Sequence, residues 1–363
     1  LNSFIVVWPS LITFHIIMTK RGDRQRLSCL ILGVLWSMAV AVAARDEGRF
    51  LLMEWNVENL YDTCRNELID DADFQPQGAY AWTQRRYLHK LRIIAQTIAS
   101  AGGVAPVDLV ALCEVENDSV LTQLTRRSVL DRLGYRYVMT HSADRRGMNV
   151  ALLYRPGRFG RLLCARCAFP KQPGASNRDV LHVTGLVPTL DTLDVYVCHL
   201  PSRSGGRWPT DDYRMRGAAM VRHDVDSVCR FRKHPMVVVT GDFNDEPADN
   251  SLRRGLRAQI GQPQRGDDGL WLLTDDLRTS SGVAGTYFFQ GRWNRLDHVV
   301  VNAALLQSDY PFRLARPACH ILDFPWLLKY DARGRAVPRR TYLGTFYQGG
   351  VSDHLPLLVQ FEF

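Results

Sequence analysis

The chain has 363 residues, of which 46% are hydrophobic and 23% are charged, and its formal net charge is +8. No Ser/Gly/Pro-rich linker, low-complexity tract or internal repeat interrupts it, which argues against several domains and favours a single one over residues 45–363. The mildly basic charge by itself is weak evidence for a nucleic-acid partner.

The first 44 residues are expected to be an N-terminal extension and a signal peptide. A basic region from Lys20 to Arg26 precedes an apolar run over 27–42, and small residues up to Ala44 offer cleavage sites. The alternative is an N-terminal membrane anchor, because about 20 apolar residues can span a bilayer. The layout predicts an exported protein that is periplasmic, on the outer surface or secreted. Without these residues, which include four basic and one acidic, the net charge is +5.

Along the rest of the chain, short runs rich in Val, Leu and aromatic residues alternate irregularly with helical patterns. The expected strands are 50–57, 108–115, 149–154, 180–187, 193–200, 236–240, 298–301 and 357–363. The expected helices are 83–100, 119–133 and 211–232. No Gly-rich phosphate loop follows the first strand, which disfavours a doubly wound nucleotide-binding fold. Two packed β-sheets flanked by helices fit this order better.

Six short segments place a carboxylate, amide or imidazole at the end of an apolar run. They are residues 55–59, 112–116, 198–203, 241–245, 295–298 and 352–356. A rigid scaffold can bring polar groups at the ends of buried strands together at one site. Two imidazoles, several carboxylates and two amides suit a hard divalent cation and a phosphate ester. The pattern therefore predicts a metal-dependent phosphoesterase.

The order of these segments resembles the endonuclease/exonuclease/phosphatase superfamily. The resemblance rests on Trp-Asn-Val-Glu-Asn at 55–59, Gly-Asp-Phe-Asn at 241–244, Arg-x-Asp-His at 295–298 and Ser-Asp-His-x-Pro at 352–356, with Glu114 and His199 in between. It covers nearly all of residues 50–363. It implies a DNase I-like, four-layer α/β/β/α sandwich in which two packed mixed β-sheets are flanked by helices. It also implies a divalent cation, Mg²⁺ or Mn²⁺, with Ca²⁺ as a further option.

Four residues are expected to lie at the cation. Glu114 ends a strand and is similar to the family's principal metal carboxylate; a surface acid that merely ends a strand is the alternative. Asn56 and Glu58 occupy alternate positions at the end of the first strand and would face the same side. Asp353 is expected beside the cation or beside His354. Mg²⁺ prefers one or two carboxylates plus water and substrate oxygens over a full protein cage.

Asp242 and Asn244 also alternate, so both can point into one cleft. There the carboxylate can orient or deprotonate water, and the amide can hold a phosphate oxygen or the nucleophile. The alternative is a simple turn, since Gly-Asp and Asn-Asp are common turn dipeptides. Arg203, four residues beyond His199, is placed to bind a phosphate oxygen, with an ordinary surface arginine as the alternative.

His199 and His354 are the two expected catalytic imidazoles. A histidine after an apolar strand is often a core residue, but a carboxylate partner would fix its tautomer and favour the imidazolium. By resemblance, Asp297 is the partner of His354, and Asp179 is the DNase I-like partner of His199. The expected reaction is in-line attack of water on phosphorus. Asp242 or His354 would take the proton of the water, and His199 or a metal-bound water would protonate the leaving oxygen.

The leading hypothesis is an exported, monomeric nuclease that cleaves DNA or RNA phosphodiesters without a stable protein partner. The alternative enzyme is a phospholipid (sphingomyelinase-like) or inositol-phosphate hydrolase, whose sign would be a hydrophobic rim near the site. A non-catalytic binding module would lack at least one key residue, and all are present. The long stretch 305–347 carries aromatic residues that could stack on bases, touch lipid or simply pack locally. Arg85, Arg86 and Lys90 make a basic face on the first expected helix, which could meet a nucleic-acid backbone but is more often solvated.

Overall fold

The computed structural model describes residues 48–167, 178–264, 266–307 and 309–363. The expected signal peptide lies outside these residues. The chain divides into two units, Leu1–Gly48 and Arg49–Phe363. Within the described ranges, no helix combines the length and the apolarity that crossing a bilayer requires.

The first of two large sheets has six strands. They are β1 (Arg49–Leu60), β2 (Leu109–Val115), β3 (Arg136–Met139), β4 (Asn149–Tyr154), β14 (Arg313–Ile321) and β19 (Leu357–Glu362). Their order across the sheet is β14-β19-β1-β2-β4-β3. Because β1 and β2 run parallel while the other neighbours are antiparallel, this sheet is mixed.

The second sheet has seven strands. They are β5 (Gly160–Cys167), β6 (Val180–Leu186), β7 (Thr192–His199), β8 (Met236–Asp242), β9 (Ala258–Gln259), β10 (Leu270–Leu272) and β13 (Asp297–Asn302). Their order is β5-β6-β7-β8-β13-β10-β9. This sheet is also mixed, since β7 and β8 run parallel, as do β9 and β10.

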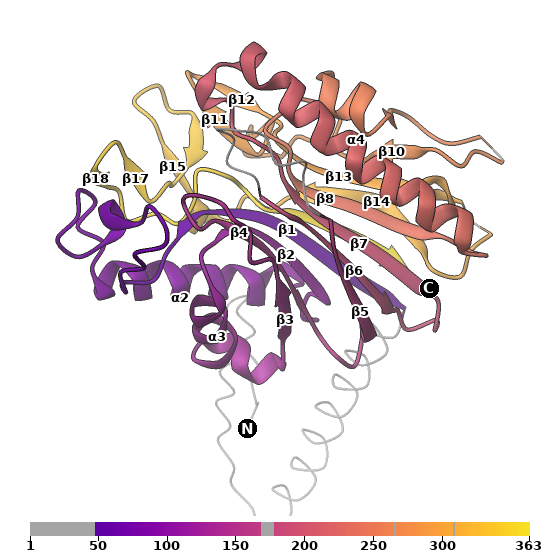
Figure 1. Cartoon of the computed structure of the whole chain (residues 1–363), viewed down its shortest axis with the longest axis horizontal. Coiled ribbons are helices and arrows are strands. Elements are labelled where there is room, and N and C mark those ends of the chain that lie inside the picture. Colours follow the sequence, from indigo (N-terminus) through magenta and orange to yellow (C-terminus); the bar gives the residue numbers. More distant parts are fainter. Residues whose placement is uncertain (1–47, 168–177, 265, 308) are drawn as a thin grey trace, which may run out of the picture. The chain divides into compact units, whose positions relative to one another are not determined.

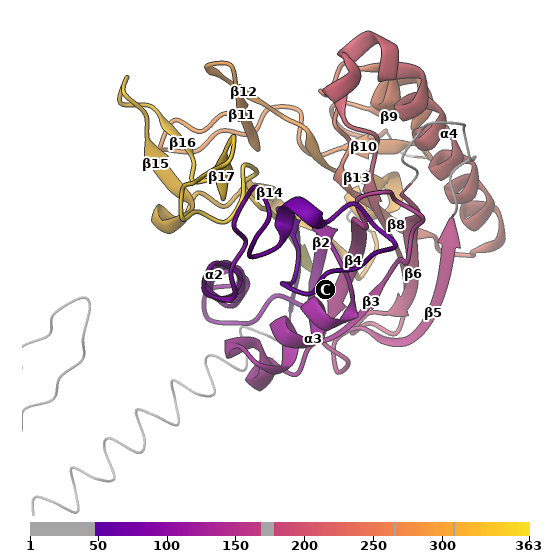
Figure 2. The same cartoon turned by 60° about the vertical axis from the view of Figure 1, so that its left-hand side comes forward.

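Helices cover the outer faces of both sheets. They are α2 (Gln84–Ala101), α3 (Asp118–Arg126) and α4 (Arg207–Phe231), with a π-helical turn at Ser251–Gly255. Figures 1 and 2 show α2 and α3 on the side of the six-stranded sheet and α4 on the side of the seven-stranded sheet. The arrangement confirms the expected α/β/β/α sandwich of two mixed sheets.

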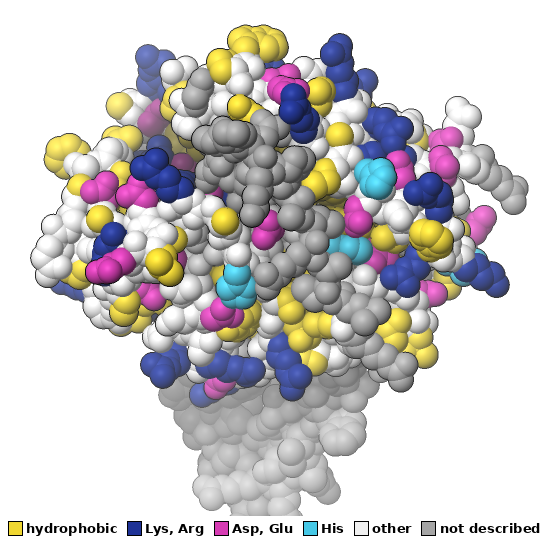
Figure 3. Space-filling view, viewed as in Figure 1, with side chains coloured by type: hydrophobic (Ala, Val, Ile, Leu, Met, Phe, Trp, Pro, Cys, Tyr) yellow, Lys and Arg dark blue, Asp and Glu magenta, His cyan; other side chains and the backbone are white. Residues whose placement is uncertain are grey.

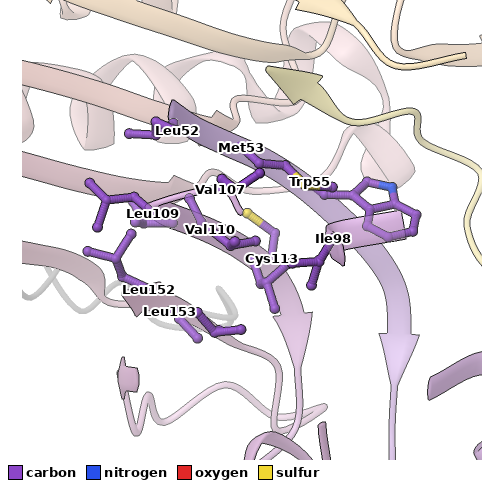
Figure 4. Packing of buried hydrophobic residues seen from close by; sticks show 14 of the residues in the cluster. Leu52, Met53, Trp55, Ile98, Val107, Leu109, Val110, Cys113, Leu152 and Leu153 are labelled. Carbon is purple, nitrogen blue, oxygen red and sulfur yellow. The ribbon is translucent and has the colours of Figure 1, made fainter. Parts of the chain in front are cut away.

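The alternation of side chains along β8 builds two layers of core. Met236 and Val238 belong to the apolar cluster between the sheets, whereas Val237 and Val239 pack with Val221 of α4 on the outer face. Successive residues of a strand point to opposite faces, so a continuous apolar run is what a strand covered on both sides requires. Figure 4 shows the apolar side chains of β1, β2 and β4 packed together, with Ile98 of α2 among them.

Two differences from the expected elements have local causes. The expected helix 119–133 is wrong in its second half, because Ser128 starts a separate 3₁₀ turn by accepting a hydrogen bond from the backbone N–H of Leu130. The strands expected at 236–240 and 298–301 extend to Asp242 and Asp297, which therefore lie inside the paired ladder and not beyond its end.

Three two-stranded ribbons extend from the sandwich. They are β11 (Tyr287–Phe289) with β12 (Arg292–Asn294), β15 (Leu328–Tyr330) with β16 (Ala336–Pro338), and β17 (Tyr342–Leu343) with β18 (Phe346–Tyr347). Both views place them on one side of the molecule (Figures 1 and 2). Arg335 Nη1 donates to Gly291 O at 2.7 Å and Lys329 Nζ to Gln348 Oε1 at 3.2 Å, which joins the three. The stretch 305–347 thus forms strand β14 and two of these ribbons.

Candidate active site

Polar residues from both sheets meet at the end of the sandwich where β1, β2, β7 and β8 finish. The parallel pairing of β7 with β8 sets His199 opposite Asp242, and the antiparallel pairing of β13 with β8 sets Asp297 opposite the same residue. Asp242 lies on the same face of β8 as Val238, which packs between the sheets. All three side chains therefore face the six-stranded sheet.

A glycine is required directly before Asp242. Gly241 has a φ of 131°, and a Cβ added there would lie 1.9 Å from the carbonyl oxygen of Cys198 on β7. No other residue tolerates both that backbone conformation and so close a neighbour. The first position of the Gly-Asp-Phe-Asn motif therefore serves the pairing of β7 with β8, which aligns His199 with Asp242.

Asn56 links the two sheets at the site. Its Nδ2 donates to Asp242 Oδ2 at 3.0 Å, and its Oδ1 accepts from the backbone N–H of Glu58 at 2.9 Å. Ser352 Oγ donates to the carbonyl of Asn56 at 2.6 Å and accepts from the backbone N–H of His354 at 3.0 Å. These bonds hold the strand end of β1, the carboxylate of β8 and the loop before β19 in one fixed arrangement.

The ends of β1 and β2 have irregular backbone. Glu58, Asn59 and Glu114 have φ values of 50°, 50° and 65°, a region that residues other than glycine rarely adopt. The pairings of β2 with β1 and with β4 both shift register there, as at a β-bulge, and such a bulge re-aims a side chain. Glu114 Oε2 accepts from the backbone N–H of Asn59 at 2.7 Å. The strained backbone thus fixes the carboxylate that the sequence assigns to the metal.

His354 and Asp297 form a buried pair. Nδ1 of the imidazole lies 2.7 Å from Asp297 Oδ2, and Nε2 lies 3.9 Å from Asp242 Oδ2. Burial lowers the pKa of His354, but the charge and hydrogen bond of Asp297, with the charges of Asp242 and Asp353, outweigh it and raise the pKa well above its usual value. Burial raises the pKa of Asp242 to about 7, against the charge of His354. The site therefore pairs an imidazolium with a carboxyl group that titrates near neutrality.

His199 has the opposite protonation state. Its Nε2 lies 3.7 Å from Glu114 Oε1 and 3.6 Å from Asp242 Oδ2. Burial, followed by the positive charges of Arg178 and Arg146, lowers the pKa of this imidazole well below its usual value. A neutral His199 can accept a proton or a hydrogen bond, whereas the expected role as proton donor requires it first to be charged.

The structure does not pair Asp179 with His199. His199 Nδ1 is buried without a hydrogen-bond partner, and the backbone N–H of Asp179 donates to Ser142 Oγ at 2.9 Å. The β6–β7 register, with Leu181 opposite Val197, extends to place Asp179 across from His199. The two residues are thus neighbours on adjacent strand ends, but the carboxylate does not orient the imidazole as the resemblance implied.

Glu114 and Asn56 offer the oxygen ligands that a hard divalent cation prefers. Burial raises the pKa of Glu114, but the positive charges of Arg146 and Arg178 and the hydrogen bond from Asn59 outweigh it, so the pKa is lowered and the carboxylate stays ionised. Glu114 Oε1 lies 3.7 Å from the nearest nitrogens of Arg146 and His199, too far for a hydrogen bond. Glu114 and the amide oxygen of Asn56 would hold the cation, which supplies charge neutralisation at the phosphate when bound.

A second group of potential ligands lies on the other side of Asp242. One ligand atom each from Asp242, Asp297 and His354 lie within 4.8 Å of one another. The imidazole here already shares its Nδ1 hydrogen with Asp297, and an imidazolium has no lone pair to offer a metal. This group is therefore better suited to proton transfer than to metal binding, and Glu114 remains the better metal ligand.

Glu58 and Asp353 both contact Arg340 at the edge of the site, and Asp353 Oδ1 also lies 4.0 Å from His354 Nε2, beside the imidazole as one of its two expected positions. Arg340 Nη2 donates to Asp353 Oδ2 at 2.8 Å and lies 3.7 Å from Glu58 Oε1, while the backbone N–H of Thr341 donates to Glu58 Oε2 at 2.7 Å. Burial and the charge of Asp353 raise the pKa of Glu58 to about 8. The side chain of Glu58 therefore serves Thr341 and Arg340, and a protonated carboxyl group is a poor metal ligand.

Lys90 corrects the expectation of a fully solvated basic face on α2. Its Nζ donates to the carbonyl of Glu58 and, at 2.9 Å, to Thr341 Oγ1, and the side chain is buried. Tyr87, Leu91 and Ile94 are buried on the same helix, so Lys90 lies within the apolar stripe. The helical spacing of Lys90 with these apolar residues indicates that it faces inward.

Arg203 is held by neighbouring acids, whereas Asn244 lies between the ends of β7 and β8, beside Asp242. Arg203 donates to the carbonyl of Asn244 and, through Nη2, to Asp245 Oδ1 at 3.1 Å and Asp249 Oδ2 at 2.6 Å. Asn244 Nδ2 donates to the carbonyl of Leu200 at 3.1 Å, and its backbone N–H donates to Asp242 Oδ1 at 2.8 Å. Arg203 therefore braces the loop after β8, and the acids that hold it leave little of its charge for a phosphate.

Sequence reasoning missed four charged residues. Arg146 and Arg178 lower the pKa of Glu114 and add to the effect of burial in lowering the pKa of His199, and Arg340 holds the acids at the rim. Glu54, inside the first apolar run, is buried with both carboxyl oxygens unpartnered. Two of these residues could have been found from the sequence, since Glu54 is an acid within an apolar run and Arg178 stands beside Asp179. Arg146 lies in a loop, where the sequence gives no such indication.

A family model described as "Endonuclease/Exonuclease/phosphatase family" matches residues 52–362. The chain belongs to the endonuclease/exonuclease/phosphatase family. The members of this family are phosphoesterases that typically use divalent metals, and the chain is accordingly a phosphoesterase. None of the curated proteins compared with the chain matches it.

Solved structures of the family share its fold. A mannosyl-6-phosphatase from Bacteroides thetaiotaomicron is 15% identical with a TM-score of 0.55, and the match covers 86% of this chain and 100% of that one. TDP2 from D. rerio, complexed with a single-strand DNA product, is 15% identical with a TM-score of 0.53, over 87% of this chain and 99% of that one. An endonuclease/exonuclease/phosphatase from Bacteroides vulgatus is 12% identical with a TM-score of 0.54, over 87% and 99%. At these identities the likeness shows the fold alone.

Proposed function

We propose that the protein is an exported, Mg²⁺-dependent nuclease that hydrolyses phosphodiester bonds in DNA or RNA. The observation that carries the proposal is the meeting of Asn56, Asp242, His199 and the His354–Asp297 pair beside Glu114. Asp242, with a pKa of about 7, is suited to take a proton from water, and the imidazolium of His354 is suited to stabilise negative charge on the phosphate. Among the solved structures of this fold, D. rerio TDP2 is complexed with a single-strand DNA product and another protein is a mannosyl-6-phosphatase, so the fold accommodates both substrate classes.

A substrate panel tests this function. Purified protein is incubated with plasmid DNA, RNA, sphingomyelin vesicles, inositol phosphates and mannose 6-phosphate, each with Mg²⁺ and with EDTA. We expect cleavage of DNA or RNA that requires Mg²⁺ and that His354→Ala abolishes. His223→Ala, at an exposed histidine of α4, is the matched control and should keep full activity. Hydrolysis of only the lipid or only the monoesters would refute the nuclease.

Export is a separate proposal that rests on the basic and apolar pattern of residues 20–44. Fractionation of cells that express the full chain tests it: the protein should accumulate outside the cytoplasm and lose its leader. A protein that stays in the cytoplasm at full length would contradict export without touching the proposed chemistry.

A further inference from the structure

Basic residues are concentrated on the ribbons beside the site. Residues 286–295 and 324–350, which form these ribbons and their connections, contain seven Lys or Arg and one acid, Asp331, a net charge of +6 in a chain whose total is +8. Arg292, Arg333 and Arg339 are exposed, and among the described residues no ion pair is formed by their guanidinium groups. Such a local surplus of unpaired arginine attracts a polyanion.

Exposed aromatic side chains occur on the same ribbons. Phe289, Tyr330 and Phe346 are 51%, 73% and 76% exposed. Figure 3 shows hydrophobic and basic side chains, with some acidic ones among them, at the upper left, over the ribbons. Cations already stack on neighbouring rings, with Arg335 5.2 Å from the ring centre of Phe288. Interleaved arginine and open aromatic rings are the features of surfaces that bind single-stranded nucleic acid.

The ribbons are attached directly to catalytic residues. Tyr287 of β11 forms a backbone bridge with His354, and their rings lie 4.8 Å apart. Phe289 stacks on Tyr287 at 6.1 Å with an interplanar angle of 21°. A row of rings therefore runs from the exposed tip of the first ribbon to the catalytic imidazole. Arg340 lies between the other two ribbons, and its Nη2 donates to Asp353, the residue directly before His354.

We propose that the three ribbons form a binding surface for single-stranded nucleic acid that leads the strand into the active site. Bases stack on Phe289, Phe346 and Tyr330, and phosphates meet the unpaired arginines. A duplex gains little from such rings, because its base faces are already stacked, whereas each base of a single strand offers an open face. The inference rests on the proposed nuclease function and specifies its substrate class.

Binding measured without catalysis tests the surface. The affinity of the full chain for a fluorescent dT₁₂ oligonucleotide is measured by anisotropy in EDTA, for Phe289→Ala, Phe346→Ala and the triple variant Arg292→Ala, Arg333→Ala, Arg339→Ala. We expect each ring to contribute about 5-fold or more in Kd. We also expect the triple variant to flatten the slope of log K against log salt by about 2, since each phosphate contact on a single strand contributes about 0.7.

Matched controls lie away from the ribbons. Phe231→Ala, at the last residue of α4, removes an 86% exposed ring, and the triple variant Arg127→Ala, Arg132→Ala, Arg136→Ala removes three exposed arginines near α3 and β3. Both should leave the Kd unchanged. Hydrolysis of the small diester bis(p-nitrophenyl) phosphate with Mg²⁺ should be the same in the control variants, in Phe346→Ala and in the triple arginine variant of the ribbons.

The outcomes separate the surface from the enzyme. Unchanged oligonucleotide affinity in the ribbon variants would overturn the surface, even if the protein cleaves DNA. Ribbon-dependent sedimentation with anionic phospholipid vesicles in place of dT₁₂ binding would also overturn it and would assign these tips to a membrane. If no diester is hydrolysed but the ribbons bind dT₁₂, the proposed function fails while the surface stands.

Discussion

His298 provides a sharp test of how burial in this structure affects stability. The side chain is fully buried, with Nδ1 2.6 Å from Thr274 Oγ1 and Nε2 2.8 Å from the carbonyl oxygen of Asp245. Burial lowers its pKa to about 4, although the hydrogen bond to Asp245 opposes the shift. The folded protein therefore binds a proton at this position less readily than the unfolded chain does, in which a histidine has a pKa of about 6.5.

The sign and size of the effect follow from linkage. Because the folded pKa is the lower one, the contribution of His298 to stability is present above pH 6.5 and is lost as the pH falls towards 4. A difference of about 2.5 pKa units corresponds to about 3 kcal/mol of unfolding free energy. Glu58 and Asp242, whose pKa values are raised to about 8 and about 7, change stability in the opposite direction over this range. The wild-type curve alone therefore cannot isolate the histidine.

Comparing the wild type with a variant that does not titrate at position 298 isolates the contribution of His298 to stability. Urea unfolding of the wild type and of His298→Gln is followed by circular dichroism between pH 7.5 and pH 4. The amide can bond to Thr274 and Asp245 but does not titrate, so its cost is independent of pH. We expect the wild-type advantage in unfolding free energy to shrink by about 3 kcal/mol on acidification. Parallel curves would refute the reasoning that burial holds His298 neutral.

Three further predictions concern the site. Glu114→Gln should abolish Mg²⁺-dependent turnover with an unchanged circular dichroism spectrum, and retained turnover would remove Glu114 from the metal site. Asp297→Asn should lower kcat by about 10² to 10⁴ with little change in KM, because His354 loses the charge that keeps it protonated; a raised KM with unchanged kcat would instead point to substrate binding. Arg203→Ala should lower the unfolding free energy by about 2 kcal/mol through the lost bonds to Asp245 and Asp249, and normal stability with weaker substrate binding would restore the phosphate role.

The sequence predicted the strands and motifs because their signals are local. A buried strand needs a continuous apolar run, so β4 was predicted at its observed bounds and β1, β2, β7 and β8 to within a few residues. The six polar segments at the ends of these runs identified the family. The ribbons and β14 escaped prediction because they are short or irregular and depend on partners far along the chain, as in the bonds of Arg335 to Gly291 and Lys329 to Gln348.

The sequence by itself determined which residue types end the buried strands, and therefore the class of chemistry. Only the tertiary structure decided what each side chain contacts. The positive φ of Glu58 breaks its alternation with Asn56, on which the sequence argument relied, and the acids around Arg203 occupy its guanidinium. Whether an imidazole is charged also depends on neighbours from other strands, as the contrast between His199 and His354 demonstrates. Electrostatic interactions fall off with distance in space, not along the chain, so a linear sequence does not contain them.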